Sequence, residues 1–465
     1  MKEQKQRYMP MWVTIAVGIF AVLMLLNFVL PFFYGVKHPV FYMKDNALYV
    51  INEGKEKGYK IADAAQKDVQ ITKDGRKIFF QDANAALYQR SLSKYSKNKK
   101  IDDDVTWFVH TSDGQTAIYV KNQELWISKG NNKRKIEESV GQVMISNDDK
   151  KLIYFKNDVF YVRGLGQNDK PELYTYGEVP FVQDIKSNYK KAFYYENNNL
   201  YLKSAGKETE LAAKDIVNAR IVGKTLYYFR SENGENVFCR YTSKGEEIIS
   251  TEMSNFYSMY EEGSPQLLLS KNNEIWVLYE NKKPFYAMSI PEEIFVPQIS
   301  DDGKKLYVAM GELGQGFHQL AVYNLKENVI KSSEVIAENV NIVNFTEKKG
   351  SVFFWDENNG LQIYKNKKII QLGKGYFSKY QNDILTYYKQ KDDEKDLWVY
   401  KKDENKLVDT WVREEAIFGK NLFYIKDNDI YWAKDNENKK IDSDVQAFVF
   451  PIGSENNYGD FFSAK

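Results

Sequence analysis

The stretch SNDDKKLIYFKNDVFYV, residues 146–162, contains the pattern that decides the fold. Two runs of apolar and aromatic residues, 152–155 and 159–162, are separated by only three polar residues. Asn and Asp tolerate the backbone angles of tight turns, and β-branched and aromatic residues favour strands. The stretch therefore predicts a β-hairpin, because each run is too short for a helix.

The same arrangement recurs about every 38 residues along the chain. Another apolar run precedes most of these pairs, as at residues 105–109, and a Lys-rich or Glu-rich stretch follows, as at 97–101. Four strands per repeat, each antiparallel to the next, are typical of a propeller blade. The sequence therefore predicts an all-β fold, a β-propeller of about eleven blades within residues 40–465. The eleven pairs begin at Val40, Ile78, Ala117, Leu152, Ala192, Leu226, Leu267, Leu306, Val352, Ile384 and Leu422.

Eleven units exceed the roughly four to eight blades of an ordinary ring. Two rings of five or six blades are the first expectation, and one unusually wide ring is the second. The first pair of runs, which begins at Val40, has no strand before it, and the final run, 445–450, has no hairpin after it. We expect these segments to join in one sheet, since this would leave no sheet edge unpaired.

A recurrent turn precedes the second strand of four repeats, at residues 72–77, 111–116, 146–151 and 300–305. An Asp or Asn side chain caps each turn, and in three of the four a Gly supplies a positive φ. The predicted structural positions are Asp74, Gly75, Asp113, Gly114, Asp302 and Gly303.

This wording resembles the S-P-D-G-K signature of TolB-type propellers, which also occurs in the propeller domains of prolyl oligopeptidase-like proteins. The resemblance covers residues 40–465 and implies a β-propeller. The usual Pro is replaced in every case, by Lys73, Ser112, Asn147 and Asp301. The overall layout also resembles membrane-anchored propeller proteins of Gram-positive bacteria whose role is uncharacterised.

The N-terminal segment has the features of a membrane anchor. Three basic residues, Lys2, Lys5 and Arg7, precede an uncharged apolar run at 11–33. A helix of that length reaches roughly 35 Å, enough to cross a bilayer core of about 30 Å. The positive-inside rule predicts a cytoplasmic segment at 1–10, a transmembrane helix at 11–33, a linker at 34–39 and an extracytoplasmic domain at 40–465. A cleaved signal peptide fits less well, because the run is long and lacks a small-residue cleavage site.

Composition excludes several classes of protein. Hydrophobic residues make up 43% and charged residues 28% of the 465, which argues against a disordered chain and a polytopic membrane protein. The 65 basic and 64 acidic residues nearly cancel, so nothing indicates nucleic-acid binding. A single cysteine, Cys239, can form neither an intrachain disulfide nor a zinc ribbon. No phosphate-binding loop, dinucleotide fingerprint, zinc-protease motif or nucleophile elbow occurs.

The remaining candidates for chemistry have ordinary structural interpretations. We expect Asp102–Asp104 to form a solvated loop, and residues 356–360 to form a hairpin turn and not a calcium loop. His110, and His318 in an insert at 310–319, are expected in loops, where either could line a pore. Cys239 is expected to pack in a strand. Tyrosines such as Tyr227 and Tyr228 are expected to alternate between the core and the blade surface. The sequence thus predicts no catalytic, cofactor-binding or metal-binding residue.

Two functions remain open. The first is a membrane-anchored binding module outside the cell, in contact with the lipid bilayer through residues 11–33 and with an envelope protein, peptide or glycan. It would need no cofactor. The second is an envelope enzyme, a lyase or glycosidase with a site in the propeller channel.

Overall fold

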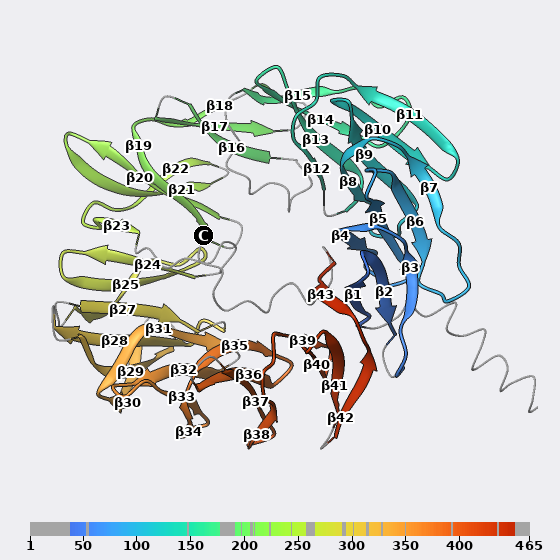
Figure 1. Cartoon of the computed structure of the whole chain (residues 1–465). Coiled ribbons are helices and arrows are strands. Elements are labelled where there is room, and N and C mark those ends of the chain that lie inside the picture. Colours follow the sequence, from blue (N-terminus) through green and yellow to red (C-terminus); the bar gives the residue numbers. More distant parts are fainter. Residues whose placement is uncertain are drawn as a thin grey trace, which may run out of the picture. The chain divides into compact units, whose positions relative to one another are not determined.

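The structure is a computed structural model and describes part of the chain. It covers residues 38–451 apart from 53–54, 147, 177–190, 197, 205–207, 209, 223–224, 243, 257–265, 291–293, 301, 313–315, 327–328, 349, 392–393 and 435–436. These residues form 43 strands, arranged in eleven antiparallel sheets, and no helix (Figure 1). The prediction of an all-β fold built from eleven hairpin repeats is therefore confirmed.

The chain divides into two compact units, of which the first comprises residues 1–140, 378–387 and 391–465. This unit 1 contains four complete sheets and most of the sheet β35-β36-β37-β38. Its strands are β1 (Val40–Lys44), β2 (Ala47–Ile51), β3 (Tyr59–Ala62), β4 (Ala65–Ile71), β5 (Lys77–Asp82), β6 (Leu87–Ser91), β7 (Lys99–Asp102), β8 (Val105–His110), β9 (Thr116–Lys121), β10 (Glu124–Lys129), β11 (Asn132–Glu137), β35 (Tyr376–Gln381), β36 (Ile384–Lys391), β37 (Glu394–Lys401), β38 (Glu404–Asp409), β39 (Glu414–Phe418), β40 (Asn421–Lys426), β41 (Asp429–Lys434), β42 (Glu437–Asp442) and β43 (Val445–Val449).

Unit 2 comprises residues 141–377 and 388–390 and contains six sheets. Its strands are β12 (Val143–Ile145), β13 (Lys151–Lys156), β14 (Val159–Gly164), β15 (Glu172–Tyr176), β16 (Lys191–Glu196), β17 (Asn199–Ser204), β18 (Glu210–Ala213), β19 (Ile216–Val222), β20 (Thr225–Glu232), β21 (Glu235–Thr242), β22 (Gly245–Ser250), β23 (Asn255–Phe256), β24 (Gln266–Lys271), β25 (Glu274–Tyr279), β26 (Phe285–Ser289), β27 (Ile294–Ile299), β28 (Lys305–Glu312), β29 (Gly316–Lys326), β30 (Val329–Glu338), β31 (Val340–Lys348), β32 (Ser351–Asp356), β33 (Gly360–Lys365) and β34 (Lys368–Lys374).

Ten of the eleven sheets are meanders in which successive strands lie side by side. The hairpin predicted at residues 146–162 is formed by β13 and β14, with Tyr154 opposite Tyr161. Asn157 and Asp158 adopt positive φ between these strands, as a tight hairpin turn requires. Ten of the sheets have four strands, and β16-β17-β18 has three among the residues that the structure describes. The sheets thus have the anatomy of propeller blades.

One sheet contains strands from both ends of the described chain. β43 pairs antiparallel with β1, with Tyr42 opposite Phe448, and completes the order β3-β2-β1-β43. In Figure 1 the red β43 lies beside the blue β1. The predicted joining of the first and last strand segments is therefore confirmed. It supplies β1 with a partner on its otherwise open edge.

The middle strands of the sheets are buried on both faces. In β20, Tyr228 packs in a cluster with Leu200 and Cys239, whereas Tyr227 and Phe229 pack in the next cluster along the chain. The expectation that these tyrosines alternate between core and surface is wrong, because the alternating side chains enter two different cores. Cys239 is buried as a packing residue, as expected.

The predicted N-terminal segments lie outside the described residues: the cytoplasmic residues 1–10, the helix at 11–33 and the linker up to residue 37. Among the residues that the structure does describe, no helix is long and apolar enough to span a membrane.

Candidate functional site: the far end of unit 1

The predicted Asp-capped turns are held by a closed set of hydrogen bonds. In the first, Thr72 Oγ1 donates to Asp74 Oδ1 at 2.7 Å, and the same oxygen accepts the backbone N–H of Arg76 at 3.0 Å. The backbone N–H of Lys77 donates to Thr72 Oγ1 at 3.0 Å, which fixes the start of β5. Asp74 Oδ1 thus shapes the turn, while Oδ2 lies 3.5 Å from Arg76 Nε.

The other three turns repeat this geometry. Gly75, Gly114 and Gly303 have φ values of 67°, 59° and 70°, and the fourth turn places Asp149 at 58°. The hydroxyl of Thr111 lowers the pKa of Asp113, since the hydrogen bond favours the charged form. All six predicted positions lie in these tight turns. The equivalent donors are Thr111, Ser146 and Ser300, which lie 2.6, 2.7 and 2.7 Å from Asp113, Asp148 and Asp302.

The two candidate histidines lie in strands and not in loops, which corrects the expectation. His110 is the last residue of β8, and its ring stacks on Phe79 with centroids 4.5 Å apart. Its Nδ1 donates to the carbonyl oxygen of Thr111 at 2.8 Å. His318 lies in β29, because β28 and β29 stay paired as far as Glu312 and Gly316 and convert the expected insert into a long hairpin.

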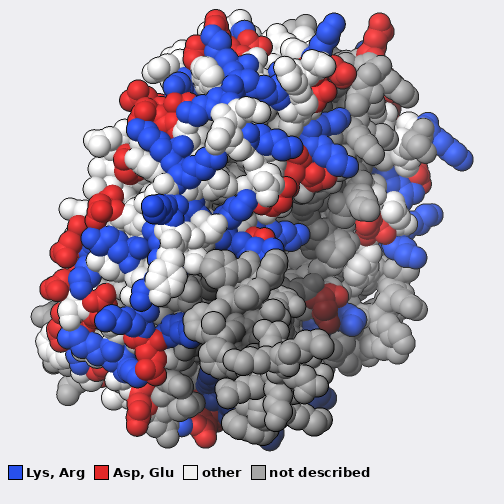
Figure 2. Space-filling view, turned by 90° about the vertical axis from the view of Figure 1, so that its right-hand side faces the viewer, with Lys and Arg blue, Asp and Glu red and all other residues white. Residues whose placement is uncertain are grey.

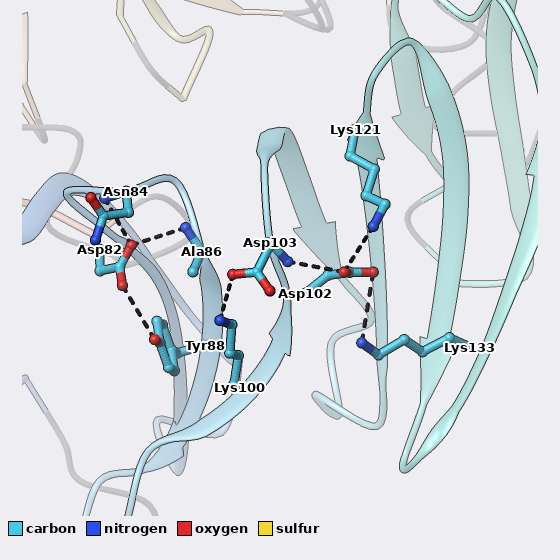
Figure 3. A network of polar contacts seen from close by, with 9 residues as sticks. All are labelled: Asp82, Asn84, Ala86, Tyr88, Lys100, Asp102, Asp103, Lys121 and Lys133. Atoms are coloured by element: carbon cyan, nitrogen blue, oxygen red, sulfur yellow. Dashed lines mark hydrogen bonds and ion pairs between the residues drawn. The ribbon is translucent and has the colours of Figure 1, made fainter.

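Asp102 is also not part of a solvated loop. It ends β7, its side chain is 11% exposed, and Figure 3 shows it between Lys121 and Lys133. Lys121 Nζ lies 2.9 Å from Oδ1, and the Tyr119 hydroxyl donates to Oδ2 at 2.7 Å. Burial alone would raise the pKa of Asp102, but the hydrogen bonds from Tyr119 and Lys121 hold it below its ordinary value. Asp103 pairs with Lys100 instead.

This trio joins neighbouring sheets at three places in unit 1. In each, an Asp at the end of a fourth strand accepts bonds from a Tyr and a Lys two residues apart on the next sheet. The signal in the sequence is a Tyr-x-Lys on the second strand and an Ile/Val-Asp at the end of the preceding repeat. The other two trios are Tyr42, Lys44 and Asp442, at 2.8 and 2.7 Å, and Tyr424, Lys426 and Asp409, at 2.7 and 2.6 Å.

Two further carboxyl groups are bonded within the protein. Asp356 accepts the backbone N–H groups of Asn358 and Gly360, at 3.0 and 2.7 Å, so the predicted hairpin turn is confirmed. Glu415 in β39 is 3% exposed, and burial raises its pKa against the opposing effects of Lys379 and the Ser378 hydroxyl. A carboxyl so enclosed is inaccessible to a substrate.

The strand register defines two ends of unit 1. Val40, where the chain enters β1, lies opposite Ile51, where β2 ends. We call this the entry end; it also carries the turns before second strands and the connections between third and fourth strands. The opposite end, which we call the far end, carries the second-to-third-strand hairpins and the connections to the next sheet. Backbone bonds join these two kinds of connection, as from Val445 N to Asn428 O at 2.7 Å.

The far end presents carboxylates that lack partners. Asp45, Asp104, Asp427 and Asp444 are exposed in turns with positive φ, at 51°, 55°, 50° and 59°. None of the four forms an ion pair with a described residue. Lys44, Lys121 and Lys426 at this end are bound in the trios, whereas Lys395, near the start of β37 and beside the Trp411 connection, is exposed. The far end therefore carries four exposed carboxylates alongside this lysine.

Trp411 lies at the same end, in the connection between β38 and β39. Its side chain is 54% exposed and its φ is 58°, an uncommon angle for a bulky residue that costs about 1–2 kcal/mol. The indole forms no hydrogen bond or ring contact with a described residue. Thr410 N donates to Asp409 Oδ1 at 2.7 Å, and Val412 N donates to Lys395 O at 3.1 Å. The flanking residues thus hold the backbone that presents the indole.

Arg413 fixes the adjoining hairpins. Its guanidinium donates to Asn428 Oδ1 at 2.6 Å and to the carbonyl oxygens of Val445 and Gln446 at 3.0 and 2.6 Å. Gln446 in turn accepts the backbone N–H of Asn46 at 3.2 Å. Asp427, Asp444 and Asp45 adjoin these bonded residues, so they are positioned by one network.

The carboxylates are spread out and not gathered at a point. Within the described ranges, no three His, Cys, Asp or Glu side chains come close enough together to hold a metal ion. The far end therefore offers dispersed, exposed carboxylates together with one exposed indole.

Comparison with known proteins shows that this chain is similar to some of them in fold only. No family model matches the chain, and no curated protein matches its sequence. The crystal structure of the tricorn protease is 11% identical with a TM-score of 0.32, over 88% of this chain and 57% of that one, so this chain spans little more than half of its length. The oligogalacturonate lyase of Vibrio parahaemolyticus is 11% identical with a TM-score of 0.28, over 59% of this chain and 95% of that one. Both contain β-propellers, and the likeness is one of fold alone.

Proposed function

We propose that this chain is a membrane-anchored, extracytoplasmic β-propeller that binds a protein or peptide of the cell envelope through the far end of unit 1. The observation that carries the proposal is Trp411, an exposed indole held at an unfavourable φ next to Arg413, which binds the segments that carry Asp427 and Asp444. Strained backbone that presents an exposed aromatic side chain is characteristic of functional positions. A Trp is also the side chain most enriched among energetically dominant contacts.

The charge of the surface indicates the chemistry of the partner. Exposed Asp45, Asp427 and Asp444 favour Lys or Arg side chains, and the Trp411 ring can accept the same cations on its face. A neutral glycan can donate hydroxyl hydrogen bonds to these carboxylates, but it gains no charge attraction from them. A peptide or protein segment rich in basic residues therefore fits the far end better.

A photo-crosslinking side chain at position 411 of the full chain in living cells tests the proposal. We expect an adduct that protease digests, and we expect the triple variant Asp45→Asn, Asp427→Asn, Asp444→Asn to lose it. The matched control is the same side chain at Lys420, which is exposed on the next sheet but at the entry end. Equal adducts at 411 and 420, or an adduct indifferent to the triple variant, would contradict the proposal.

Trp411→Gly separates binding from folding. Glycine accepts a φ of 58° at no steric cost, so the free energy of unfolding should stay within about 1 kcal/mol of the wild type. Loss of an aromatic anchor costs about 2 kcal/mol of binding, so affinity for the captured partner should fall about 30-fold. The measurement is thermal unfolding alongside titration of the partner. Unchanged affinity would remove Trp411 from the site.

A further inference from the structure

The entry end of unit 1 has the opposite charge character to the far end. Four exposed lysines, Lys55, Lys57, Lys94 and Lys97, lie in two connections between third and fourth strands, together with Tyr95. We call these five residues the entry surface. We propose that the entry surface rests on the headgroups of an anionic lipid bilayer. The inference rests on the proposed function, because the bilayer is the one that would hold the predicted anchor at 11–33.

The path of the chain brings this end toward the anchor. Val40 pairs with Ile51, and Val50 pairs with Tyr59, so the chain enters β1 beside the connection that carries Lys55 and Lys57. Six residues, 34–39, separate the predicted span from β1, and they reach at most about 21 Å. A bilayer holding residues 11–33 is therefore close to the entry end.

The lysines of the entry surface are free to meet phosphate groups. None of Lys55, Lys57, Lys94 and Lys97 forms an ion pair with a described residue. Neighbouring lysines are engaged within the protein: Lys60 with Asp63 and Lys100 with Asp103. Figure 2 shows Lys and Arg side chains interspersed with Asp and Glu side chains over the described part of one face. The four lysines of the entry surface therefore carry positive charges that no ion pair with a described residue neutralises.

Tyr95 adds an interfacial anchor. It is 84% exposed, more than any other large hydrophobic residue described, and Lys94 Nζ lies 5.8 Å from its ring centroid. Tyr and Trp concentrate at the headgroup level of membranes, where the ring contacts lipid and the hydroxyl contacts water. A lone exposed tyrosine between two lysines suits that environment.

A buried arginine holds this connection in shape. Arg90 donates to the carbonyl oxygens of Ile61, Ser93 and Lys94, at 2.6, 3.4 and 3.4 Å, and to Asn98 Oδ1 at 3.3 Å. Asn98 Nδ2 also donates to Ile61 O, at 3.1 Å, which ties the connection to β3 of the neighbouring sheet. Binding therefore requires little further ordering of the backbone.

The native cysteine permits a direct test in the full chain. Burial raises the pKa of Cys239 to about 12, so a thiol reagent should label an introduced exposed cysteine instead. A fluorophore at Ser96→Cys reports on the entry surface. The matched control is Ala83→Cys, in the exposed hairpin of the same sheet but at the far end. Both proteins are placed in lipid nanodiscs that carry a spin-labelled headgroup quencher.

In phosphatidylglycerol discs we expect at least twofold stronger quenching at position 96 than at 83, weakening with added salt and in phosphatidylcholine discs. Each Lys→Gln change at 55, 57, 94 and 97 should lower the contact equilibrium about fivefold. The same four-charge change at the exposed Lys282, Lys283, Lys367 and Lys368 should have no effect.

The outcomes distinguish the two proposals. A chain that enters the discs but shows equal quenching at 96 and 83 overturns the bilayer contact and leaves the anchor intact. Quenching at 96 that persists in the four-lysine variant, or that is equal in phosphatidylcholine, also overturns it. A chain that does not enter discs at all overturns the anchor and, with it, this inference.

Discussion

Replacing Tyr42 by Phe removes the hydroxyl that joins the sheet β3-β2-β1-β43 to the sheet β39-β40-β41-β42. That hydroxyl donates to Asp442 Oδ2 at 2.8 Å, and the Tyr42 ring is fully buried. A hydrogen bond to a charged group contributes about 1.5–3 kcal/mol. The Asp442 side chain is 24% exposed, so water can partly replace the donor. We therefore expect a loss near the lower bound, about 1.5 kcal/mol, which is about tenfold in the equilibrium for local opening.

Hydrogen exchange measured by mass spectrometry reads this opening locally. Peptides that cover β1 and β43 should exchange about tenfold faster in Tyr42→Phe, while peptides from β24 and β25 stay unchanged. The control is Tyr49→Phe: its ring stacks on Tyr42 at 5.4 Å, but its hydroxyl has no described hydrogen bond. Equal exchange in the two variants would refute the reasoning.

The difference in stability between Tyr42→Phe and the wild type should also depend on pH. Burial raises the pKa of Asp442, but the hydrogen bonds from Lys44 and Tyr42 outweigh it and hold the pKa below the ordinary value. A lowered folded-state pKa gives stability that is present above the unfolded value of about 3.9 and is lost as pH falls through the folded pKa. Tyr42→Phe and wild type should therefore converge below about pH 4.

Two further changes test the buried acid and the recurrent turn. The raised pKa of Glu415 means that its contribution is fully present below about pH 4.3 and is lost as pH rises through the folded pKa. Glu415→Gln should remove this dependence in denaturant unfolding across pH, and a decline parallel to the wild type would contradict it. At Gly303 a Cβ would lie 2.6 Å from Gln266 Oε1, whereas at Gly130, of similar φ, it would meet nothing within 4 Å. Gly303→Val should thus lower stability by more than about 1 kcal/mol and by more than Gly130→Val does; equal shifts in melting temperature would argue against the steric part.

The hairpins were predictable because their signals are local. In residues 146–162 the turn residues and the aromatic runs lie within one window, and the pairing of β13 with β14 needs no distant partner. The meeting of Asp102 with Tyr119 and Lys121 could not be derived in the same way, because it depends on how one sheet stacks on the next. The recurring Tyr-x-Lys and Ile/Val-Asp patterns of these trios predict the contact only once the structure has shown one of them.

The far end shows why the candidate site escaped prediction. Backbone propensity assigns a positive φ to Gly, Asn or Asp, so nothing in the sequence marks Trp411 as left-handed. The positive φ of Trp411 is held by hydrogen bonds of its neighbours Thr410 and Val412 and not by Trp411 itself. His110 was misplaced because it pairs with Ala117 of β9, so β8 extends to the residue before the turn.

The pairing of β1 with β43 also sets the order in which the protein can finish folding. The Tyr42 and Asp442 side chains that meet at this junction are 400 positions apart in the chain. Synthesis at about 5–20 residues per second leaves β1 without β43 for about 20–80 s after β1 has been made. During that time one edge of the first sheet is open to other strands and to proteases. The emergence of β43, and not that of β1, therefore starts the final step of assembly, and a chain cut short before β43 retains that open edge.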